Sequence, residues 1–467
     1  MLDVLNPATE EVVERLAPAT EGDADAAVAR AKEAFPAWRD VEPADRSRLL
    51  RRLADALESD QENLAQLESK NTGKPIGDSR GEMGMVAETF HYYAGMPERL
   101  LGDTIPVSGG VDVTFREPLG VVALITPWNF PLTIASWKMA PALSAGNTLV
   151  LKPAELTPLT ALEFERMALE AGIPEGVVNV VVGPGSIVGK RLVEHPDVAK
   201  VAFTGSTEVG KGIMAGAAGT IKRVTLELGG KSANVIFADA NLEKAAASAP
   251  VAVFGNAGQD CCARSRILVE RGVFDEFLSL MEPAVTGMRV GDPFDETTEM
   301  GPLISAEHRE RVASYVPEDA PVAIRGEAPE GTGFWYPPVV LAPVDNKDRA
   351  AAEEIFGPVV AVIPFQDEDD AVRLANDTIY GLSGSIWTEN GARALRVARR
   401  METGVISVNS NTSVRVPTPF GGMKHSGVGR ELGPHALDYY TEVKNVYIST
   451  EGEEHPSEPW AQGAEGD

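Results

Sequence analysis

One pattern recurs from about residue 118 onward: a short apolar run that ends at Gly, Pro or Asn. The first series of runs is GVVALITPWNFP, NTLVLKPAE, VVNVVVGPG, VAKVAFTGST and SANVIFAD, and helical stretches at 157–172 and 186–195 lie between them. Buried apolar strands that alternate with helices are typical of a parallel sheet in an α/β fold. A second series, SRILVE, FWYPPVVL, GPVVAVIPF, SGSIWT and GVISVNS, predicts a second α/β unit.

The two ends of the chain differ from this pattern. Residues 22–70 are predicted to be helical, because Leu49, Leu50, Leu53, Leu57 and Leu64 recur at helical spacing with charges between them. Such a stripe indicates core packing rather than an interaction surface. The acidic tail, residues 453–467, has no period and is predicted to be disordered.

Length and charge limit the classes of function. A chain of 467 residues exceeds one ordinary core, so two or three domains are expected. The formal net charge of −27, with no basic stripe, argues against binding to nucleic acid or to an anionic membrane. The start, MLDVLNPATEE, lacks the basic and apolar regions of a signal peptide, and no apolar stretch is long enough to span a bilayer. We therefore expect a cytoplasmic protein.

The basic residues are unevenly divided, since Lys supplies only 14 of the 42. An acid-rich, lysine-poor surface suggests a cytoplasm with high salt, where screening removes the self-repulsion of the surface charges. An ordinary acidic soluble protein is the alternative interpretation of the same composition.

Both cysteines of the chain are adjacent, Cys261 and Cys262, within GNAGQDCCARSR. Two cysteines cannot form a disulfide framework, and a bond between neighbours would close a strained ring. The six histidines show no spacing that converges on Cys261, so no metal site is expected. Two interpretations remain: one thiol is a nucleophile, or two small hydrophobic residues lie together by chance.

Polar residues follow two of the predicted strands. Lys152 and Glu155 come just after NTLVL, and in open parallel sheets ligands bind at the carboxyl ends of strands. A carboxylate there can accept hydrogen bonds from a ribose diol and would repel a 2′-phosphate. Gly205, Ser206 and Gly210 follow another strand, where they could bring backbone N–H groups to a pyrophosphate or form only a strand-to-helix turn.

Two further polar residues stand in short motifs of their own. Asn129 in PWNFP is held between aromatic and proline neighbours, which suits an oxyanion donor or a simple turn cap. Glu227 ends an apolar stretch before the glycines of ELGGK, where it could be a general base or a solvated loop residue.

Seven motifs occur together in one order: TPWNFP, LKPAE, FTGSTEVG, ELGGK, GQDC, EIFGPV and PFGGMKHSGVGRELG. This set closely resembles the aldehyde dehydrogenase superfamily, and the resemblance runs from about residue 5 to 450. It implies an NAD(P)-dependent enzyme that oxidises an aldehyde.

The resemblance implies catalytic roles for three residues. Cys261, two places after GQ, corresponds to the nucleophile, and Cys262 to a non-catalytic neighbour. Asn129 and the backbone N–H of Cys261 correspond to the oxyanion hole, and Glu227 to the general base. Family members that pass the acyl group to coenzyme A generally lack this glutamate, so we expect an enzyme that hydrolyses its thioester and releases a carboxylate.

The resemblance also implies a cofactor site. Glu354 and Phe356 resemble the residues that hold the nicotinamide ribose and ring, while Lys152 and Glu155 resemble the clamp on the adenosine ribose. The glutamate of this clamp favours NAD, with NADP as the alternative. The full implied set is Thr126, Pro127, Trp128, Lys152, Glu155, Gly185, Phe203, Gly205, Ser206, Leu228, Glu354 and Phe356.

Domain organisation and assembly follow from the same resemblance. It implies a Rossmann-type cofactor-binding domain at 1–98 and 118–229, an α/β catalytic domain at 230–428, and a β-arm for oligomerisation at 99–117 and 429–452. The arm pairs strands between subunits in the family, so a homodimer or homotetramer is expected.

Two residues, Trp137 and Arg415, bear on the class of aldehyde that the enzyme accepts. Trp137 stands where enzymes for succinate semialdehyde usually place an arginine, and an aromatic residue there is typical of enzymes for aliphatic, amino- or betaine aldehydes. Trp137 could line an apolar tunnel, meet a cation or merely pack between helices. Arg415, in the predicted substrate loop, could meet a carboxylate or point to solvent. We rank an aliphatic, amino- or betaine-type aldehyde first and a carboxylated semialdehyde second.

Two other classes of function are weighed against this one. A catalytically silent structural or binding relative would need none of Cys261, Glu227 and Asn129, which are all present. A thiol hydrolase that works without a cofactor would not need the ribose and nicotinamide motifs.

Overall fold

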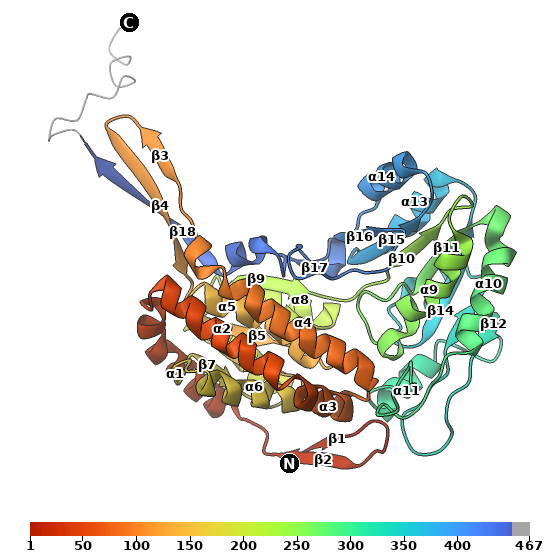
Figure 1. Ribbon diagram of the computed structural model, residues 1–467, viewed down its shortest axis with the longest axis horizontal. Helices are drawn as coiled ribbons and strands as arrows, with labels where there is room; N and C mark the ends of the chain where they lie inside the picture. Colours follow the sequence, from red (N-terminus) through yellow and green to blue (C-terminus); the bar gives the residue numbers. More distant parts are fainter. Residues whose placement is uncertain (451–467) are drawn as a thin grey trace, which may run out of the picture.

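The computed structural model describes residues 1–450 of the chain. Two lobes, each built on a mainly parallel sheet with helices packed against it, lie side by side, and a smaller antiparallel sheet projects from the first lobe (Figure 1). The predicted α/β class is confirmed. The predicted disorder of 453–467 lies outside the described residues, and the domain boundaries given above stay a prediction.

The first lobe contains a six-stranded sheet, counted within residues 1–450, in the order β17-β9-β8-β5-β6-β7. Its strands are β5 (Val121–Ile125), β6 (Thr148–Lys152), β7 (Val178–Val180), β8 (Val198–Thr204), β9 (Arg223–Glu227) and β17 (Gly427–Val428). Its helices are α1 (Glu21–Arg39), α2 (Pro43–Ser59), α3 (Gln61–Thr72), α4 (Ile76–Ala94), α5 (Pro131–Ser144), α6 (Leu159–Glu170), α7 (Lys190–Glu194) and α8 (Thr207–Ala218). Helices α1 to α3 confirm the helical prediction for 22–70, and four of the five leucines of the stripe are buried: Leu50, Leu53, Leu57 and Leu64.

The order of strands creates a switch point beside β5. The chain runs from β5 to β6 and β7 on one side, and then returns to place β8 on the other side of β5. All of these strands are parallel, so their carboxyl ends meet at one edge of the sheet. In open α/β sheets this is where ligands bind.

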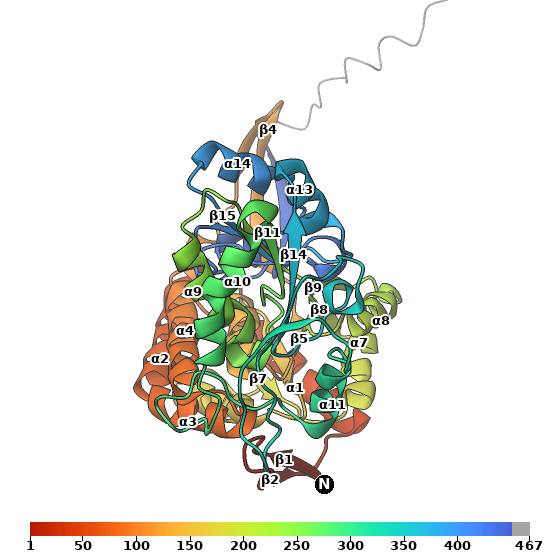
Figure 2. The ribbon, with the colours of Figure 1, turned by 90° about the vertical axis from the view of Figure 1, so that its right-hand side faces the viewer.

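The second lobe contains a seven-stranded sheet among the described residues, in the order β12-β13-β14-β11-β10-β15-β16. Its strands are β10 (Ala233–Ile236), β11 (Arg266–Glu270), β12 (Val322–Arg325), β13 (Val339–Leu341), β14 (Val359–Phe365), β15 (Ser383–Trp387) and β16 (Val405–Val408). Its helices are α9 (Leu242–Phe254), α10 (Phe274–Thr286), α11 (Ala306–Ala313), α12 (Arg349–Ala352), α13 (Glu368–Asn376) and α14 (Gly391–Arg400). Figure 2 looks onto this lobe, with α10 in front of the sheet.

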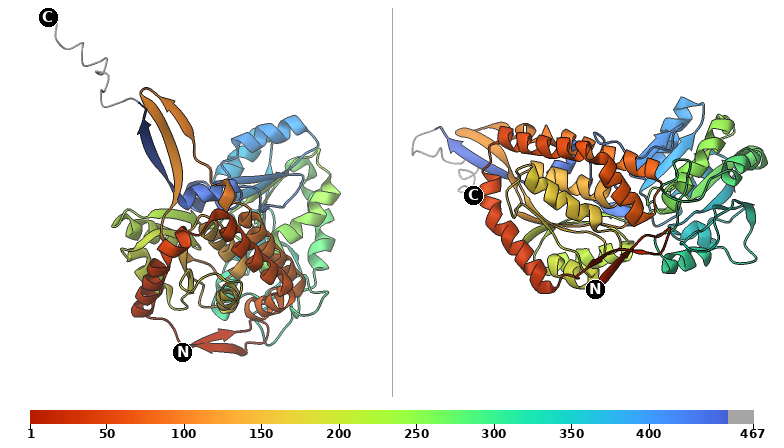
Figure 3. Two further views of the ribbon diagram at one scale, coloured as in Figure 1. Left: turned by 60° about the vertical axis from the view of Figure 1, so that its left-hand side comes forward. Right: turned by 60° about the horizontal axis from the view of Figure 1, so that its bottom comes forward.

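Three strands form the projecting sheet: β3 (Thr104–Val107), β4 (Gly110–Pro118) and β18 (Thr441–Ser449), in the order β18-β4-β3. They extend away from the body of the molecule (Figure 3, left). Strand β18 is an edge strand that pairs with β4 along its whole length. A hairpin of β1 (Leu2–Leu5) and β2 (Val12–Leu16), which the sequence did not predict, lies near the N-terminus.

Two predicted elements are shorter than their apolar runs. In FWYPPVVL only Val339–Leu341 is a strand, because Pro337 and Pro338 have no N–H to give to a sheet. The helix predicted at 186–195 is a π-helical turn over Gly185–Gly189 followed by α7. None of the helices within residues 1–450 combines the length and the apolar character needed to cross a membrane.

Candidate active site

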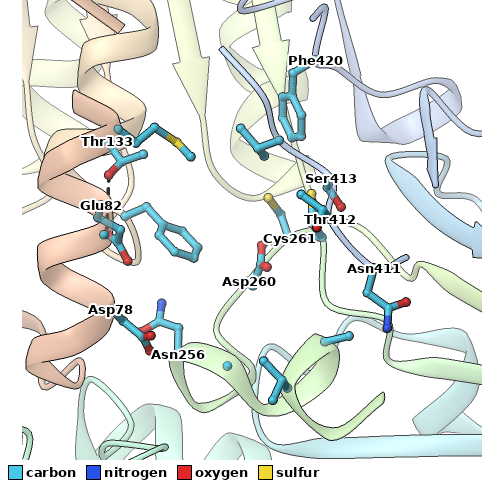
Figure 4. Close-up of a pocket in the computed structure, with 18 of the residues that line it drawn as sticks. Asp78, Glu82, Thr133, Asn256, Asp260, Cys261, Asn411, Thr412, Ser413 and Phe420 are labelled. Atoms are coloured by element: carbon cyan, nitrogen blue, oxygen red, sulfur yellow. Dashed lines mark hydrogen bonds between the residues drawn. The ribbon is translucent and has the colours of Figure 1, made fainter. Parts of the chain in front are cut away.

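A cavity of about 830 Å³ lies where the two lobes meet, and Cys261 faces it (Figure 4). Its walls come from α4, α5 and α9, from the loop around Cys261 (residues 255–263, the cysteine loop) and from residues 409–414, which follow β16. Three predicted site residues line this cavity: Cys261, Glu227 and Trp137.

The cysteine loop has an unusual backbone. Asn256, Ala257 and Gly258 follow one another with left-handed φ angles of 51°, 55° and 71°. A Cβ on Gly258 would collide with the backbone of Gly357, so the glycine allows the EIFGPV segment to pack against the cysteine loop. A Cβ on Gly230 would likewise collide with the carbonyl oxygen of Cys261. The motifs ELGGK, GQDC and EIFGPV therefore meet through close backbone contacts.

The two thiols have different surroundings. Cys261 is half-buried at the cavity, whereas Cys262 is buried in an apolar cluster with Trp137 and Phe420. Two effects raise the pKa of Cys261 above its ordinary value. The larger is a hydrogen bond with the Cys262 thiol, and the next is burial. A raised pKa favours the neutral thiol, so Cys261 would need a base or a change of surroundings before it could act as a nucleophile.

Glu227 is a buried carboxylic acid, 3% exposed, and neither of its oxygens has a hydrogen-bond partner among the described residues. Burial raises its pKa well above the ordinary value, and the nearby carboxylate of Glu431 raises it further. Glu431 itself is ion-paired with Lys138, whose ammonium also donates to Oγ1 of Thr204 at 2.7 Å. An unpartnered carboxyl with a raised pKa, facing a cavity, suits a general base.

Asn129 is attached to the cysteine loop by its side chain. Its side-chain Nδ2 donates to the carbonyl oxygen of Gln259 at 2.9 Å. The backbone carbonyl oxygen of Asn129 accepts from Nδ2 of Asn256 and from Nζ of Lys74, both at 3.0 Å. Asn129 is not among the residues that line the cavity, and within the described residues the second N–H of its amide makes no hydrogen bond. Within the described residues the backbone N–H of Cys261 makes no intramolecular hydrogen bond. These are the two donors that the oxyanion prediction requires.

The predicted ribose clamp lies at the carboxyl ends of β5 and β6. The N–H of Thr126 donates to the carbonyl of Lys152 at 3.1 Å, and the Lys152 ammonium lies 3.8 Å from Oε1 of Glu155. The same Oε1 accepts from the N–H of Gly185 at 3.0 Å. Burial lowers the pKa of Lys152. The arrangement fixes one carboxylate oxygen and leaves the other for a diol.

The next part of the predicted cofactor site follows β8. Phe203 is buried near the end of the strand, and the N–H of Gly205 donates to the carbonyl of Glu227 at 3.0 Å. Ser206 is the exposed N-cap of α8, and its Oγ accepts from the N–H of Val209 at 3.4 Å. The helix N-terminus next to Ser206 presents further N–H groups, which suit a pyrophosphate.

The predicted nicotinamide residues lie against the cysteine loop. Oε1 of Glu354 accepts from the N–H of Gly230 at 2.9 Å, and burial raises the pKa of Glu354. Phe356 has a left-handed φ of 60°, and its ring meets the half-buried Trp128 edge-on at 5.3 Å. Pro127, before Trp128, is also half-buried, and Leu228 is buried with its N–H bonded to the carbonyl of Ser426 at 2.9 Å.

These residues fit a dinucleotide. They occupy the carboxyl edge of the sheet at its switch point, and the hydroxyl of Thr126 is buried there without a partner in the described structure. The residues predicted to hold one ribose lie at the end of β6, the N-terminus of α8 follows β8, and the carboxylate of Glu354 accepts from the N–H of Gly230.

The two predicted substrate residues have different positions. Trp137 lines the cavity, where its ring meets that of Phe420 edge-on at 5.2 Å. Arg415 is exposed and is not among the residues that line the cavity, although its neighbours Ser413 and Val414 are. The structure therefore brings Trp137 to the substrate side of the thiol and leaves Arg415 outside.

Carboxylates that sequence reasoning missed also line the cavity. Asp78 and Glu82 lie on α4, and Asp260 precedes the nucleophile (Figure 4). Glu82 is ion-paired with the buried Lys74, whereas Asp78 has no ion pair among the described residues. One carboxylate oxygen of Asp260 and the two cysteine sulfurs lie within 4.8 Å of one another. The i, i+4 spacing of Asp78 and Glu82 could have indicated one helix face, but not that this face meets the thiol.

The family is decided by the match to a family model. Residues 1–446 match the model described as "Aldehyde dehydrogenase family". The chain belongs to the aldehyde dehydrogenase family. It is therefore an oxidoreductase that acts on aldehydes, as the resemblance implied.

Known relatives cover nearly the whole of this aldehyde dehydrogenase. DhaS of Bacillus subtilis is 46% identical over 457 residues, which are 96% of this chain and 92% of DhaS. A solved structure of PnpE in complex with nicotinamide adenine dinucleotide is 45% identical, with a TM-score of 0.95 over 97% of this chain and 95% of PnpE. A structure of betaine aldehyde dehydrogenase from Staphylococcus aureus in complex with NAD+ is 39% identical, with a TM-score of 0.94 over 97% of this chain and 92% of that protein.

Proposed function

We propose that this aldehyde dehydrogenase oxidises an aldehyde to a carboxylate with NAD, through a thiohemiacetal and then a thioester on Cys261. The observation that carries the proposal is that Cys261 and the unpartnered acid Glu227 face one cavity. Asn129, whose amide is fixed on the cysteine loop, completes the set.

Attack on the aldehyde requires the Cys261 thiolate. The thiol proton passes to water in the cavity, so the attack itself does not depend on Glu227. The sulfur then forms a bond to the carbonyl carbon, and the C=O electron pair moves to the oxygen. The free N–H of Asn129 and the N–H of Cys261 donate to this oxyanion.

Bound NAD would supply a hydride acceptor. As the C–H bond of the thiohemiacetal breaks, the electron pair on the oxyanion re-forms the C=O bond, and a thioester remains on Cys261. Hydrolysis is the task of Glu227, which takes a proton from water as the water oxygen attacks the acyl carbon. The C–S bond breaks, the carboxylate leaves and Cys261 is restored. A buried base with a raised pKa is well matched to this step near neutral pH.

The residues of the first lobe support NAD as the cofactor. Lys152 and Glu155 would hold the adenosine ribose, the N-terminus of α8 at Ser206 the pyrophosphate, and Glu354 the nicotinamide ribose. The carboxylate of Glu155 would repel a 2′-phosphate, which favours NAD over NADP. PnpE and the S. aureus enzyme, both with NAD bound, have the same fold at high identity.

The lining of the cavity supports a cationic aldehyde, of the amino- or betaine type, as the first substrate to test. Asp78 and Asp260 are carboxylates without an ion pair among the described residues, while the one lining ammonium, that of Lys244, is exposed. Aromatic rings complete the wall: Phe130, Trp137, Trp387 and Phe420. Carboxylates and aromatic faces both attract an ammonium group.

A carboxylated semialdehyde is the second candidate. It would need a cation at the far end of the cavity, and Arg415, which was the candidate for this role, is exposed outside the lining. An uncharged aliphatic aldehyde would still fit the aromatic wall.

We further propose a cytoplasmic homo-oligomer that forms through the projecting sheet. The free edge of β18 can pair with another strand, and unpaired edges of this kind need cover. Apolar side chains are exposed on the same sheet: Ile105, Phe115, Val443, Val446, Tyr447 and Ile448. A dimer or tetramer would cover them, and light scattering of the purified protein measures its mass.

The proposal is tested by NADH formation at 340 nm with propionaldehyde, 4-aminobutyraldehyde, betaine aldehyde and succinate semialdehyde. The two cationic aldehydes should give the highest kcat/KM. Cys261→Ala should abolish oxidation and the matched control Cys262→Ala should largely keep it. Oxidation that survives in Cys261→Ala, or a clear preference for succinate semialdehyde, would contradict the mechanism or the substrate class respectively.

A further inference from the structure

Arg264 is a buried arginine three residues after the nucleophile, and the proposed mechanism gives it no role. Its side chain is 1% exposed, between the cysteine loop and the first residue of β11. Within residues 1–450 it forms no salt bridge, and its guanidinium donates hydrogen bonds only to neutral hydroxyl and carbonyl oxygens. Burial lowers the pKa of Arg264, although it stays protonated.

The guanidinium donates to three separate segments. Nη1 donates to the carbonyl oxygen of Cys262 at 2.6 Å, and Nε donates to Oγ of Ser385 on β15 at 2.7 Å. Nη2 donates to Oγ of Ser413 at 2.8 Å, and more weakly to the carbonyl of Asn411 at 3.4 Å. The remaining acceptors are Oγ of Ser383 and the carbonyl of Gly384.

These contacts join two walls of the cavity. The Cys262 carbonyl belongs to the residue directly after Cys261, whereas Asn411 and Ser413 belong to the 409–414 loop, which also lines the cavity. The donors of a guanidinium form a rigid planar fork. A shift of the 409–414 loop therefore moves the fork or breaks its bond to the cysteine loop.

We propose that Arg264 is a positioning residue that couples the 409–414 loop to the orientation of the Cys261 thiol. Through it, contacts with the far end of the aldehyde affect how the nucleophile is presented. The inference rests on the proposed role of Cys261 as the nucleophile.

Arg266 offers a control within the same segment. It is equally buried, and its guanidinium also donates to neutral groups: the carbonyls of Lys231, Leu374 and Ala375, and Oδ1 of Asn346. None of these acceptors lines the cavity. Arg266→Lys should therefore lower the thermal stability as Arg264→Lys does, but without changing the reactivity of the Cys261 thiol.

The test compares the full-length variants Arg264→Lys, Arg264→Gln, Ser413→Ala and Arg266→Lys. Three quantities are measured: the thermal midpoint, the rate at which iodoacetamide alkylates Cys261 (located by peptide mass), and kcat and KM for propionaldehyde and 4-aminobutyraldehyde. Alkylation needs neither aldehyde nor cofactor, so it reports on the thiol alone.

Arg264→Gln should slow alkylation and lower kcat with both aldehydes by about 10- to 100-fold, the range that a small misplacement of a reacting group costs. Arg264→Lys should recover part of both rates, since an ammonium can reach one of the two loops. Ser413→Ala removes the hydroxyl acceptor that the loop offers to the guanidinium, so it should also slow alkylation, by less than Arg264→Gln does. Arg266→Lys should lower only the thermal midpoint.

The proposal is wrong if the Arg264 variants behave as Arg266→Lys does, with a lower thermal midpoint but a wild-type alkylation rate and kcat. A wild-type alkylation rate in Ser413→Ala would overturn the coupling to the loop, even if Arg264→Gln fails to fold. Failure of the mechanism itself has a different signature, which is continued oxidation by Cys261→Ala.

Discussion

Glu431 raises the pKa of Glu227, although the Glu431 carboxylate is ion-paired with Lys138. Replacing Glu431 with Gln removes a negative charge and leaves the ammonium of Lys138 unpaired, and both changes lower the pKa of Glu227. A general base must be ionised to act, so the acid limb of the pH profile of kcat should move to lower pH.

The matched control for this prediction is Glu442→Gln, which removes an exposed carboxylate on β18 that does not line the cavity. It should leave the profile in place. Thermal midpoints of both variants are needed, because breaking a buried ion pair costs about 3–5 kcal/mol. An acid limb that stays fixed or moves to higher pH in Glu431→Gln would contradict the assignment of Glu227 as the base.

Asp78 should contribute to recognition of a cationic aldehyde. Asp78→Asn removes a cavity carboxylate that has no ion pair among the described residues. KM for 4-aminobutyraldehyde should rise about fivefold, because an exposed charge pair contributes up to ~1 kcal/mol to binding. KM for propionaldehyde should not change. Glu88→Gln, at an exposed position of the same helix that does not line the cavity, is the control. Equal effects on both aldehydes would count against an electrostatic role.

Glu155 should determine the preference between NAD and NADP. Its carboxylate is fixed by the N–H of Gly185 and lies beside Lys152. Glu155→Gln removes the repulsion of a 2′-phosphate, so kcat/KM with NADP should rise ~tenfold or more, because juxtaposed like charges cost several kcal/mol. Initial rates at equal cofactor concentrations measure this, with Glu170→Gln on α6 as a control at an exposed position. A wild-type enzyme that turns over faster with NADP would refute the assignment.

The excess of acidic residues predicts stabilisation by salt. At a net charge of −27, screening by molar potassium chloride should raise the thermal midpoint relative to low salt. Sucrose at matched osmolality controls for solvent exclusion, which stabilises proteins without screening. The same midpoint in low and molar salt would leave an ordinary acidic protein as the explanation.

Much of the architecture could be predicted from local sequence, because buried parallel strands are apolar along their whole length. The runs at 121–125 and 148–152 are strands with every residue buried. The same rule overestimated the strand at 339–341, where two prolines precede the ladder. The hairpin β1–β2 was missed because its strands are short and only Val4 among their residues is fully buried.

The grouping of the candidate site residues could be predicted where they lie in motifs. Cys261, Glu227 and Trp137 line one cavity, and Asn129 is bonded to the loop that carries the thiol. Asp78 and Arg264 could not be placed in the same way. Their roles depend on which segments the fold brings to them, and no spacing in the sequence reports that.

The location of the acyl group tests the central claim most directly. Glu227→Gln, supplied with NAD and aldehyde, should release one burst of NADH and then stall, because thioester hydrolysis has lost its base. Acid quenching, proteolysis and mass spectrometry would then locate the trapped acyl group. The account predicts the acyl mass on the sulfur of Cys261 and an unmodified Cys262. An acyl group on Cys262, or a burst of NADH that leaves neither thiol acylated, would contradict it.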